Sequence, residues 1–484
     1  MSTQVVVFIF YFGLVFFIGW YSYQTTDDES DYWIAGGNLG WALGGATLAA
    51  THTSAGSFIG TIGVIYSVGW SFGWLVLSIP LAYWFVAAVL APRFTRVKEL
   101  TLPAYMERRY YSKVARAVAA LIILIATVVY IQAQIVAGGL VANIVFGIST
   151  TQGMVGFTVV LLVYTMIGGM VAVVYTDFLQ LVIMSVGAII AVPLALHHLD
   201  GWNTLVAYVQ VVNPDTFTWS GLPGTLLFTM GLAFFLGSIA APEKLIRLYA
   251  MKDMRTIRRG VLLTIIAVTV INLLVFILGL TSIVQFPLLP TGDLAMPVIA
   301  RAVLPTITGA LILAAVTSAM MSTVDSLLIV AGSALSEDIY QSVIDPDVSR
   351  KNRLLIARVG ILVVGTLPVI FILLGFGEGE LVQFIVLLFT ALMASSFCVP
   401  VVGGILWKRA TKEGAIAAML GGVSAAVVWK LFGYENIDPV VPGFLFSLAL
   451  MIGVSLVTKP PPQSALTPYF GSPSDERRSE DVPV

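Results

Sequence analysis

The chain has 484 residues, of which 58% are hydrophobic and 11% are charged, and its formal net charge is -1. Soluble domains carry about 25% charged residues, so this composition and a mean hydropathy of +0.96 exclude a soluble globular protein and predict an integral membrane protein. The single cysteine, Cys398, and the three histidines exclude internal disulfides and cysteine-rich or histidine-rich metal centres. The balanced charge identifies no partner, and we expect no nucleic-acid binding.

The apolar runs last about 20 residues instead of alternating over about 10, which predicts an all-α membrane protein and not a barrel. Residues 1–24 lack a basic leader and a clear cleavage site, so we interpret them as a retained first span and not as a signal peptide. Two of the runs are longer than a bilayer is thick and must tilt, break or protrude. The thirteen predicted spans are 2–24, 41–70, 71–92, 114–147, 150–173, 176–198, 222–246, 258–286, 306–336, 354–376, 379–407, 413–432 and 439–458.

The basic residues indicate how these spans are oriented. If the N-terminus lies outside the cell, all but Arg301 and Lys430 of the 25 lysines and arginines fall in cytoplasmic loops or the tail. Because positive charge is retained on the cytoplasmic side, this distribution predicts an N-out, C-in topology and makes the basic clusters topology determinants. The loop with Asp27 and Asp31 is acidic, and acidic residues count little in this rule.

The loops are too short for a soluble domain, and the tail 460–484 is rich in Pro, Ser and charge, which predicts disorder. No nucleotide-binding motif is present, so any energy must come from a gradient.

Two spans carry interruptions. In 41–70, small and hydroxylated residues surround His52, and an unwound stretch there would free carbonyl oxygens beside a cavity. In 222–246, Pro242 follows Gly237-Ser-Ile-Ala-Ala and disfavours helix before it. Two interrupted helices at matching places in ten consecutive spans indicate an inverted-repeat transporter with a midplane site. Ordinary small-residue packing between helices is an equal alternative from the pattern alone.

Polar residues inside the spans are the remaining candidates. Gln132 and Gln134 mark either a helix contact or a substrate path, and His52 is favoured as a structural or substrate contact over a proton carrier. Asp177 lies close to a span boundary, where a solvated or capping role is an alternative.

The run 319–326 is the strongest indication of function in the chain. Its hydroxyls and a carboxylate occupy two helical turns in the middle of a long apolar segment. Ser322, Asp325 and Ser326 share one face at spacings of three and four. A carboxylate at the bilayer centre costs about 2.5–3.5 kcal/mol, and hydroxyl and carboxylate oxygens are ligands of hard cations. The segment therefore predicts a small-cation site within the membrane.

The polar residues described above resemble those of the sodium:solute symporter family, and the likeness extends over nearly the whole chain, to about residue 458. Within the family the sequence is most similar to pantothenate permeases, through Thr47–Thr51 with Ser57–Gly60 and through Asp438–Pro442. The blocks that carry the family likeness are Ser54–Gly60, Gly168–Gln180, Arg247–Asp253, Ala319–Thr323, Glu337–Tyr340 and Leu406–Gly414.

The resemblance implies a ten-helix inverted-repeat core of the leucine-transporter type. The implied segments are 1–40 (an added span and the acidic loop), 41–199 and 200–410 (the two repeats), 411–459 (two added spans) and 460–484 (the tail).

The resemblance also implies a sodium site between the second and ninth spans. Ala50, Thr53 and Ala319 would provide carbonyl oxygens, and Ser322 and Thr323 would provide hydroxyls.

Some relatives have a second sodium site, which would correspond here to Asp177, Asp325 and Ser326. The family member with that site has serine at the position of Asp325, so a second sodium, a proton and a salt-bridge partner all stay open. Phe234, Gly237 and Ser238 replace the sugar contacts of sugar symporters, which argues against a sugar. The candidate substrate contacts are His52, Ser57, Phe58, Gln132, Gln134, Phe234, Gly237 and Ser238.

The sequence therefore predicts a non-enzymatic, multi-pass transporter of the plasma membrane that functions as a monomer. It would couple Na+ entry to uptake of a small organic solute, with a monocarboxylate or pantothenate-like substrate first and proline or another amino acid next. Proton-coupled symport of the same solutes is the nearest alternative, and a symporter-like solute sensor or an ion channel is less favoured because the tail is short and the helices are interrupted.

Overall fold

The computed structural model describes residues 3–24, 33–97, 99–212, 214–218, 221–377, 379–434 and 436–471. These residues form helices joined by short connections, and their only β-type pairing is an isolated bridge between Leu39 and Met251. The acidic loop with Asp27 and Asp31, Lys98 and the end of the tail lie outside the described residues.

The first part of the chain runs from the peripheral helix α1 to the long helix α9. Its elements are α1 (Thr3–Tyr23), η1 (Ala35–Gly37), α3 (Trp41–His52), η2 (Gly56–Gly60), α4 (Thr61–Val68), η3 (Gly69–Trp74), α5 (Leu75–Phe85), η4 (Val86–Leu90), α6 (Ala91–Phe94), α7 (Leu102–Tyr110), α8 (Lys113–Phe146) and α9 (Thr150–His197).

The second part runs from a short connecting helix to the last helix that is described. Its elements are α10 (Trp202–Val212), η5 (Pro214–Phe217), α11 (Gly224–Ala240), α12 (Pro242–Ala250), α13 (Met254–Gln285), η6 (Gly292–Leu294), α14 (Ala295–Ala302), α15 (Thr306–Ser333), η7 (Ala334–Ile344), α16 (Arg350–Leu373), α17 (Val382–Met393), η8 (Ala394–Cys398), α18 (Val399–Leu406), α19 (Lys412–Leu431), α20 (Val440–Val457) and α21 (Gln463–Phe470).

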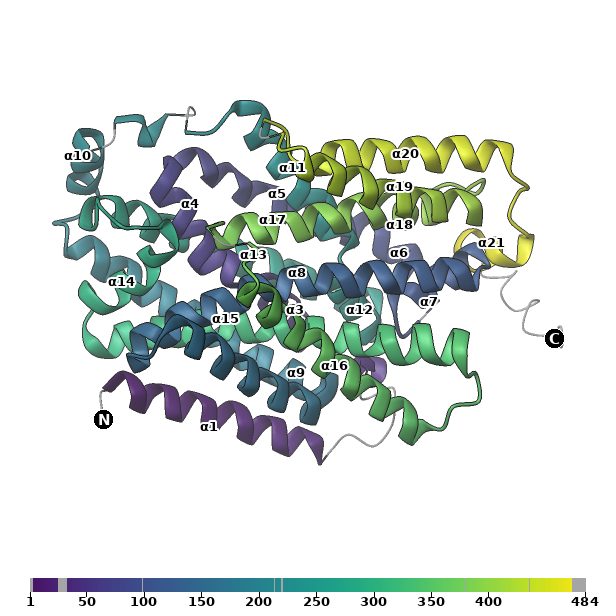
Figure 1. Ribbon diagram of the computed structural model, residues 1–484, viewed down its shortest axis with the longest axis horizontal. Helices are drawn as coiled ribbons and strands as arrows, with labels where there is room; N and C mark the ends of the chain where they lie inside the picture. The colour runs from purple at the N-terminus through teal and green to yellow at the C-terminus, as the bar shows by residue number, and fades with distance from the viewer. Residues whose placement is uncertain are drawn as a thin grey trace.

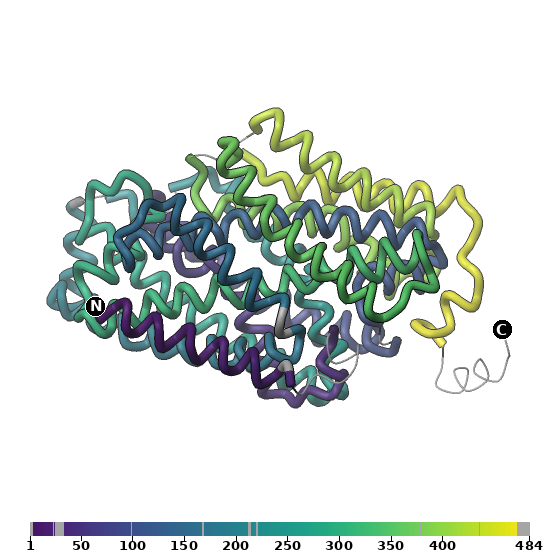
Figure 2. Tube along the Cα trace, turned by 60° about the horizontal axis from the view of Figure 1, so that its bottom comes forward, coloured from purple at the N-terminus to yellow at the C-terminus, as the bar shows by residue number. Residues whose placement is uncertain are grey.

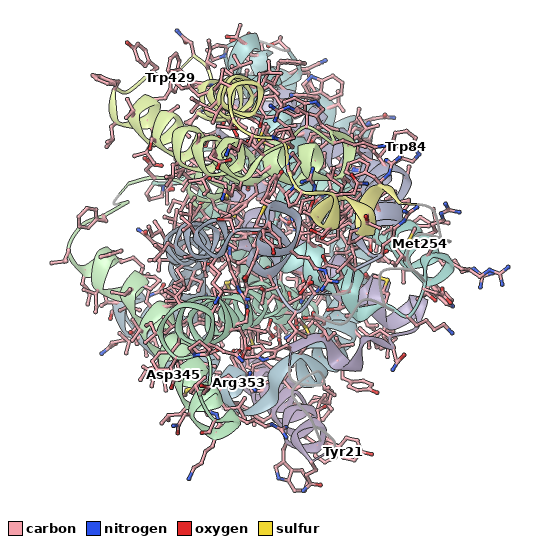
Figure 3. All side chains as sticks on the ribbon, turned by 90° about the vertical axis from the view of Figure 1, so that its right-hand side faces the viewer. Tyr21, Trp84, Met254, Asp345, Arg353 and Trp429 are labelled. Carbon is pink, nitrogen blue, oxygen red and sulfur yellow. The ribbon has the colours of Figure 1, made fainter. Side chains whose placement is uncertain are left out.

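The long helices run roughly along one axis, with α1 at one edge and α19 and α20 at the opposite edge (Figures 1 and 2). Helix α15 lies inside the bundle and packs against α3, α8, α9 and α16. An end-on view places Tyr21 and Trp84 at the periphery (Figure 3), where their side chains are 59% and 62% exposed. A bundle with an apolar outer surface requires a surrounding apolar phase, so this is a multi-pass membrane protein.

Eleven helices of the described residues are long and apolar enough to cross a membrane. The count of thirteen and the N-out, C-in topology therefore stay predictions. The two spans expected at 150–173 and 176–198 correspond to two helices within α9, Thr150–Met166 and Gly169–His197, which meet at the non-helical Gly169 (φ 59°, ψ -170°). This backbone conformation is accessible to glycine at little cost. The hydroxyls of Tyr164 and Thr176 are hydrogen-bonded to each other, although twelve residues of continuous helix would hold them about 18 Å apart, so the chain folds back at this turn.

Both predicted interruptions are present. Helix α3 ends at His52, Thr53 is extended (φ -78°, ψ 112°), and the chain resumes as the π-helical turn η2. Helix α11 ends at Ala240 and α12 begins at Pro242, with Ala241 extended between them. The arrangement supports the predicted inverted-repeat core, in which a broken helix occurs in each repeat.

One prediction about a polar segment is wrong, and another is incomplete. Residues 463–470 of the expected disordered tail form α21, because Tyr469 is fully buried and packs edge-on against Tyr105. Arg109 is not only a topology determinant: it is fully buried and donates to the carbonyl oxygens of Gly404 and Trp407. Those carbonyls belong to the end of α18, where a cation is favourable.

Asp293 joins the connection before α14 to the start of α17. Its side chain is buried, and Oδ2 accepts a hydrogen bond of 2.9 Å from the backbone N–H of Val382. Oδ1 has no hydrogen-bond partner among the described residues. Burial raises the pKa of Asp293 to about 6, although the bond from Val382 opposes this shift.

We predict that Asp293→Asn stabilises the protein above pH 6. The unfolded carboxyl titrates near ~3.9, so the native state loses stability as pH rises from about 4 through about 6, and the variant avoids this loss while keeping an acceptor for Val382. Thermal denaturation of purified protein between pH 5 and 8 would show the melting-temperature gain growing with pH. Asp215→Asn, at an exposed site, is the control, and a gain that shrinks with pH would contradict the prediction.

Candidate functional site

The break after α3 presents backbone carbonyl oxygens within the bundle. The N–H of Thr53 still bonds to Ala49, at 3.0 Å, but the chain then leaves the helical path. The carbonyls of Ala50, Thr51 and Thr53 therefore point toward partners outside their own helix. Since these residues are fully buried, the partners must come from protein or from a bound polar species.

The hydroxyls of α15 lie opposite these carbonyls. Ser322 donates to the carbonyl of Ala50 at 2.9 Å and lies 3.2 Å from that of Ala319. Thr323 contacts the carbonyls of Ala319 at 3.0 Å and Thr53 at 3.4 Å. The structure thus brings together the five residues predicted to form a sodium site, and we call them the α3–α15 oxygen cluster: Ala50, Thr53, Ala319, Ser322 and Thr323.

The α3–α15 oxygen cluster has the chemistry of a site for a small hard cation. Each of its groups is neutral, each offers oxygen, and each is at most 1% exposed. Hard cations are held by carbonyl and hydroxyl oxygens, and a neutral set leaves the ion's own charge uncompensated so that binding can be reversed. Rotation of the two hydroxyls would free their lone pairs for an ion, because they donate to the carbonyls that would share it.

A second polar cluster lies one turn further along α15. Asp177 on α9 is fully buried, so the solvated alternative for this residue is wrong. Its Oδ2 accepts from Thr47 at 2.5 Å. Ser326 lies 3.2 Å from Thr51 across the α3–α15 contact. Asp325 is also fully buried, and its Oδ1 lies 3.4 Å from the Ser326 hydroxyl.

A cation of the protein itself occupies this second cluster. The fully buried guanidinium of Arg247, from α12, lies 3.3 Å from Asp177 Oδ2 and donates to Ser326 Oγ at 2.5 Å. Its Nε donates to Thr47 at 2.9 Å. Arg247 was predicted to be a topology determinant in a cytoplasmic loop, and that placement is wrong. The break before Pro242 is the signal that redirects α12 and its basic residues into the bundle.

The two carboxylates of the second cluster are not fully satisfied. Asp177 Oδ1 and Asp325 Oδ2 are buried and have no hydrogen-bond partner in the described part of the chain. The cluster contains one guanidinium and two carboxylates, so one further positive charge, either a proton or a cation, would bring its net charge to zero. The structure therefore brings Asp177, Asp325 and Ser326 together without deciding which species completes them.

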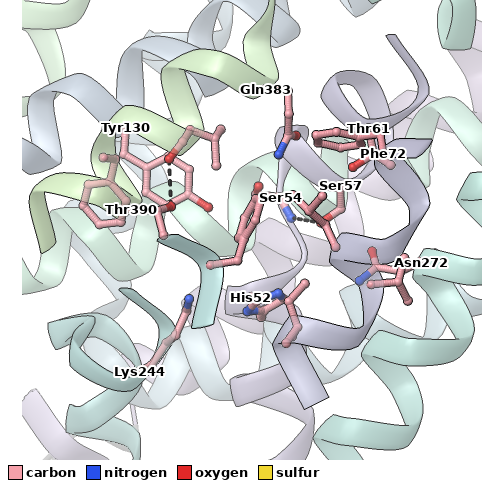
Figure 4. A pocket seen from close by; sticks show the side chains of 16 residues that line it. His52, Ser54, Ser57, Thr61, Phe72, Tyr130, Lys244, Asn272, Gln383 and Thr390 are labelled. Atoms are coloured by element: carbon pink, nitrogen blue, oxygen red, sulfur yellow. Dashed lines mark hydrogen bonds between the residues drawn. The ribbon is translucent and has the colours of Figure 1, made fainter. Parts of the chain in front are cut away.

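A cavity of about 50 Å³ lies beside the break in α3. A single buried water molecule requires about 10–15 Å³ of such space. The cavity therefore has space for a few water-sized groups and is suited to a small solute. Of the eight candidate substrate contacts, His52, Ser57 and Phe234 line it. Figure 4 shows His52 and Ser57 projecting from the two sides of the break.

The other five candidates do not line the cavity. Phe58 is buried in the apolar core, and the packing of Gly237 against Thr390 leaves no room for a side chain. Gln132 donates to the carbonyl of Phe376, and Gln134 accepts from the N–H of Ala55 at 2.9 Å. Both glutamines therefore bond to backbone groups of neighbouring segments, beyond the end of α16 and at the break in α3; a contact between helices was one of their two predicted roles. Ser238 lies behind the cavity, 3.5 Å from the ammonium of Lys244.

Several lining residues were missed by sequence reasoning, because nothing in their spacing separates them from packing residues. One signal was available for Lys244, which lies three residues after the extended Ala241 and so follows the break into the bundle. The missed polar residues are Ser54, Thr61, Tyr130, Lys244, Asn272, Gln383 and Thr390.

A protein-family model and several relatives of known sequence match this chain. A model of the sodium:solute symporter family matches residues 32–422. The osmoregulated proline transporter OpuE of Bacillus subtilis is 29% identical to this chain over 96% of this chain and 97% of its own length. A sodium/proline symporter of Staphylococcus aureus is 28% identical, over 93% and 92%.

Comparison with solved structures concerns the fold alone. A Na+-coupled sialic acid symporter, described in a substrate-bound outward-open state with a novel Na+ site, has a TM-score of 0.82 and 20% identity over 95% of this chain and 99% of that chain. Mhp1, a nucleobase-cation-symport-1 family transporter in a closed conformation, has a TM-score of 0.63 and 13% identity over 94% and 99%. These neighbours support the predicted transporter fold.

We predict that Arg247→Met strongly destabilises the protein. The substitution leaves Asp177 buried without its cation, which costs about 3–5 kcal/mol. Adding Asp177→Asn removes the orphaned charge and should recover most of the loss. Denaturation of purified protein measures both changes, with Arg258→Met, at an exposed position, as the control. Equal stability of the parent and the Arg247 variant would show that the ion pair is not needed for folding.

Proposed function

Because this chain belongs to the sodium:solute symporter family, we propose that it is a secondary active transporter that couples sodium entry to the uptake of a small organic solute. The proposal includes a plasma-membrane location, a functional monomer, thirteen spans and an outside N-terminus. The observation that carries it is the break in α3, because this one break lines both the oxygen cluster and the cavity.

The role proposed for the α3–α15 oxygen cluster is to bind the transported sodium ion. Ala50 and Thr53 flank His52 in sequence, and His52 lines the cavity. An ion held by carbonyls of the break and by Ser322 and Thr323 would fix the position of the break against α15. Fixing the break also fixes His52 and Ser54, so solute binding would be favoured when sodium is bound.

L-Proline is the substrate that we propose first. The relatives reported above are named as proline transporters, and the cavity, of about 50 Å³, favours a small solute. Pantothenate and other monocarboxylates, which the sequence analysis placed first, receive no support from those relatives. They stay secondary candidates.

The energy available from one sodium ion is sufficient for concentrative uptake. Moving one charge through ~100 mV yields ~2.3 kcal/mol, which at ~1.4 kcal/mol per decade supports about 40-fold accumulation of a zwitterion. A tenfold sodium gradient adds about one decade. For a monoanionic solute the voltage contribution would vanish in one-to-one transport, because no net charge would cross.

We propose a stoichiometry of one sodium per solute. Arg247 supplies one positive charge to the second cluster, and in this proposal the further charge that the two carboxylates can accept is a proton. Current and uptake measured together in voltage-clamped proteoliposomes should give one charge per L-proline. A ratio of two charges per proline would contradict this stoichiometry and would support a second sodium at Asp177, Asp325 and Ser326.

Proton coupling is the second candidate function. The observation that favours it is the Oδ2 of Asp325, which has no hydrogen-bond partner among the described residues. Uptake driven by an imposed pH gradient in sodium-free buffer would support this alternative and would contradict obligatory sodium coupling.

We predict that the double substitution Ser322→Ala and Thr323→Ala raises the sodium concentration for half-maximal uptake at least tenfold. Both hydroxyls that face the carbonyls of the break are removed, whereas the packing of α15 against α8, α9 and α16 is kept. Thr317→Ala is the matched control, because within the described part of the chain that hydroxyl donates only to Leu313 of its own helix. An unaltered sodium dependence in the double variant would refute the assignment.

A further inference from the structure

Lys244 is the one lysine or arginine among the described residues that line the cavity, and no aspartate or glutamate lines it. The side chain starts in the first turn of α12, just after the break at Ala241. Figure 4 shows its ammonium directed into the cavity, on the side where His52 lies. We propose that Lys244 binds the carboxylate of the transported solute, an inference that rests on the proposed function and names the chemistry of its substrate.

Among the described residues, the ammonium has no carboxylate partner at ion-pair distance. Its hydrogen bond to Ser238 is long, at 3.5 Å, and no carboxylate of the described residues lies within the 4.0 Å of an ion pair. The carboxylate of Glu243, the preceding residue, interacts electrostatically with the ammonium from beyond that distance, and it is buried outside the lining of the cavity. An ammonium held out of bulk water with no carboxylate at ion-pair distance is costly, and an incoming carboxylate lowers this cost through a charge-assisted hydrogen bond.

The rest of the lining fits a small carboxylate with an apolar body. The walls are formed by Phe72, Leu75, Ile79, Phe234 and Phe389. Unused polar groups are few: His52 Nδ1 and Gln383 Oε1 are buried without hydrogen-bond partners in the described part of the chain. His52 can donate a second hydrogen bond to the carboxylate, and Gln383 Oε1 can accept one from a donor elsewhere on the solute.

Two classes of solute, amino acids and monocarboxylates, carry a carboxylate that Lys244 could bind. An amino acid such as L-proline would place its ammonium near a neutral acceptor such as Gln383, whereas a monocarboxylate has no such group and matches the excess positive charge of the lining. L-Proline, cyclopentanecarboxylate and L-prolinamide separate these features: the second lacks the amine, and the third lacks the carboxylate.

The test is binding of the three compounds to the purified full-length protein, in the presence and absence of sodium, by calorimetry or thermal shift. In the parent protein, at least one of the two carboxylates should bind, and L-prolinamide should bind at least tenfold more weakly than L-proline or cyclopentanecarboxylate, whichever is tighter. Tighter binding of L-proline identifies an amino-acid transporter, and tighter binding of cyclopentanecarboxylate identifies a monocarboxylate transporter.

Lys244→Met should weaken carboxylate binding at least tenfold, leave L-prolinamide binding within about twofold, and leave the sodium-induced thermal shift intact. Lys244→Arg keeps the charge and should retain part of the affinity. Lys252→Met, at an exposed position, is the matched control.

Unchanged carboxylate affinity in Lys244→Met, binding of L-prolinamide as tight as that of the carboxylates, or no binding by either carboxylate would each overturn the assignment. Carboxylate binding that depends on Lys244 but not on sodium would support this inference while contradicting sodium coupling, so the two failures are distinguishable.

Discussion

The structure depends on one constraint: a helix that breaks inside a membrane must find partners for the carbonyl oxygens it frees. The break between His52 and Gly56 frees carbonyls in the centre of the bundle, and the hydroxyls of Ser322 and Thr323 meet them. This requirement holds α3 against α15. It also explains why small residues and hydroxyls, instead of large apolar side chains, occupy the contact. A neutral set of oxygens that satisfies the backbone in this way is also a set that a sodium ion can use.

The second broken helix supplies charge where the first supplies oxygens. Because the chain turns at Ala241 and Pro242, the basic residues of α12 enter the bundle instead of remaining at its surface. Arg247 reaches the acid on α9, and Lys244 reaches the cavity. Both positive charges are therefore placed by one bend. The first balances a buried carboxylate of the protein, and the second is available to balance a carboxylate of the solute.

Much of the site could be predicted from the sequence, because its ligands are close together along the chain. Ala319, Ser322 and Thr323 share a helix face by their spacing alone, and the family likeness paired them with Ala50 and Thr53. The roles of Arg247 and Lys244 could not be predicted in this way. Basic residues near the end of an apolar run are normally retained at the cytoplasmic surface, and sequence spacing does not reveal how far a broken helix bends. Likewise, Gln132 and Gln134 required partners, but only the tertiary packing distinguishes helix contacts from a cavity lining.

The central claim is that the break in α3 links the oxygen cluster to the cavity. Thermodynamic linkage provides the most direct measurement: the affinity for sodium with and without saturating substrate, and the affinity for substrate with and without saturating sodium, on the same purified protein. The account predicts that each ligand tightens the other by the same factor, greater than fivefold, and that Ser322→Ala with Thr323→Ala abolishes this factor. Affinities that do not depend on the other ligand would contradict it.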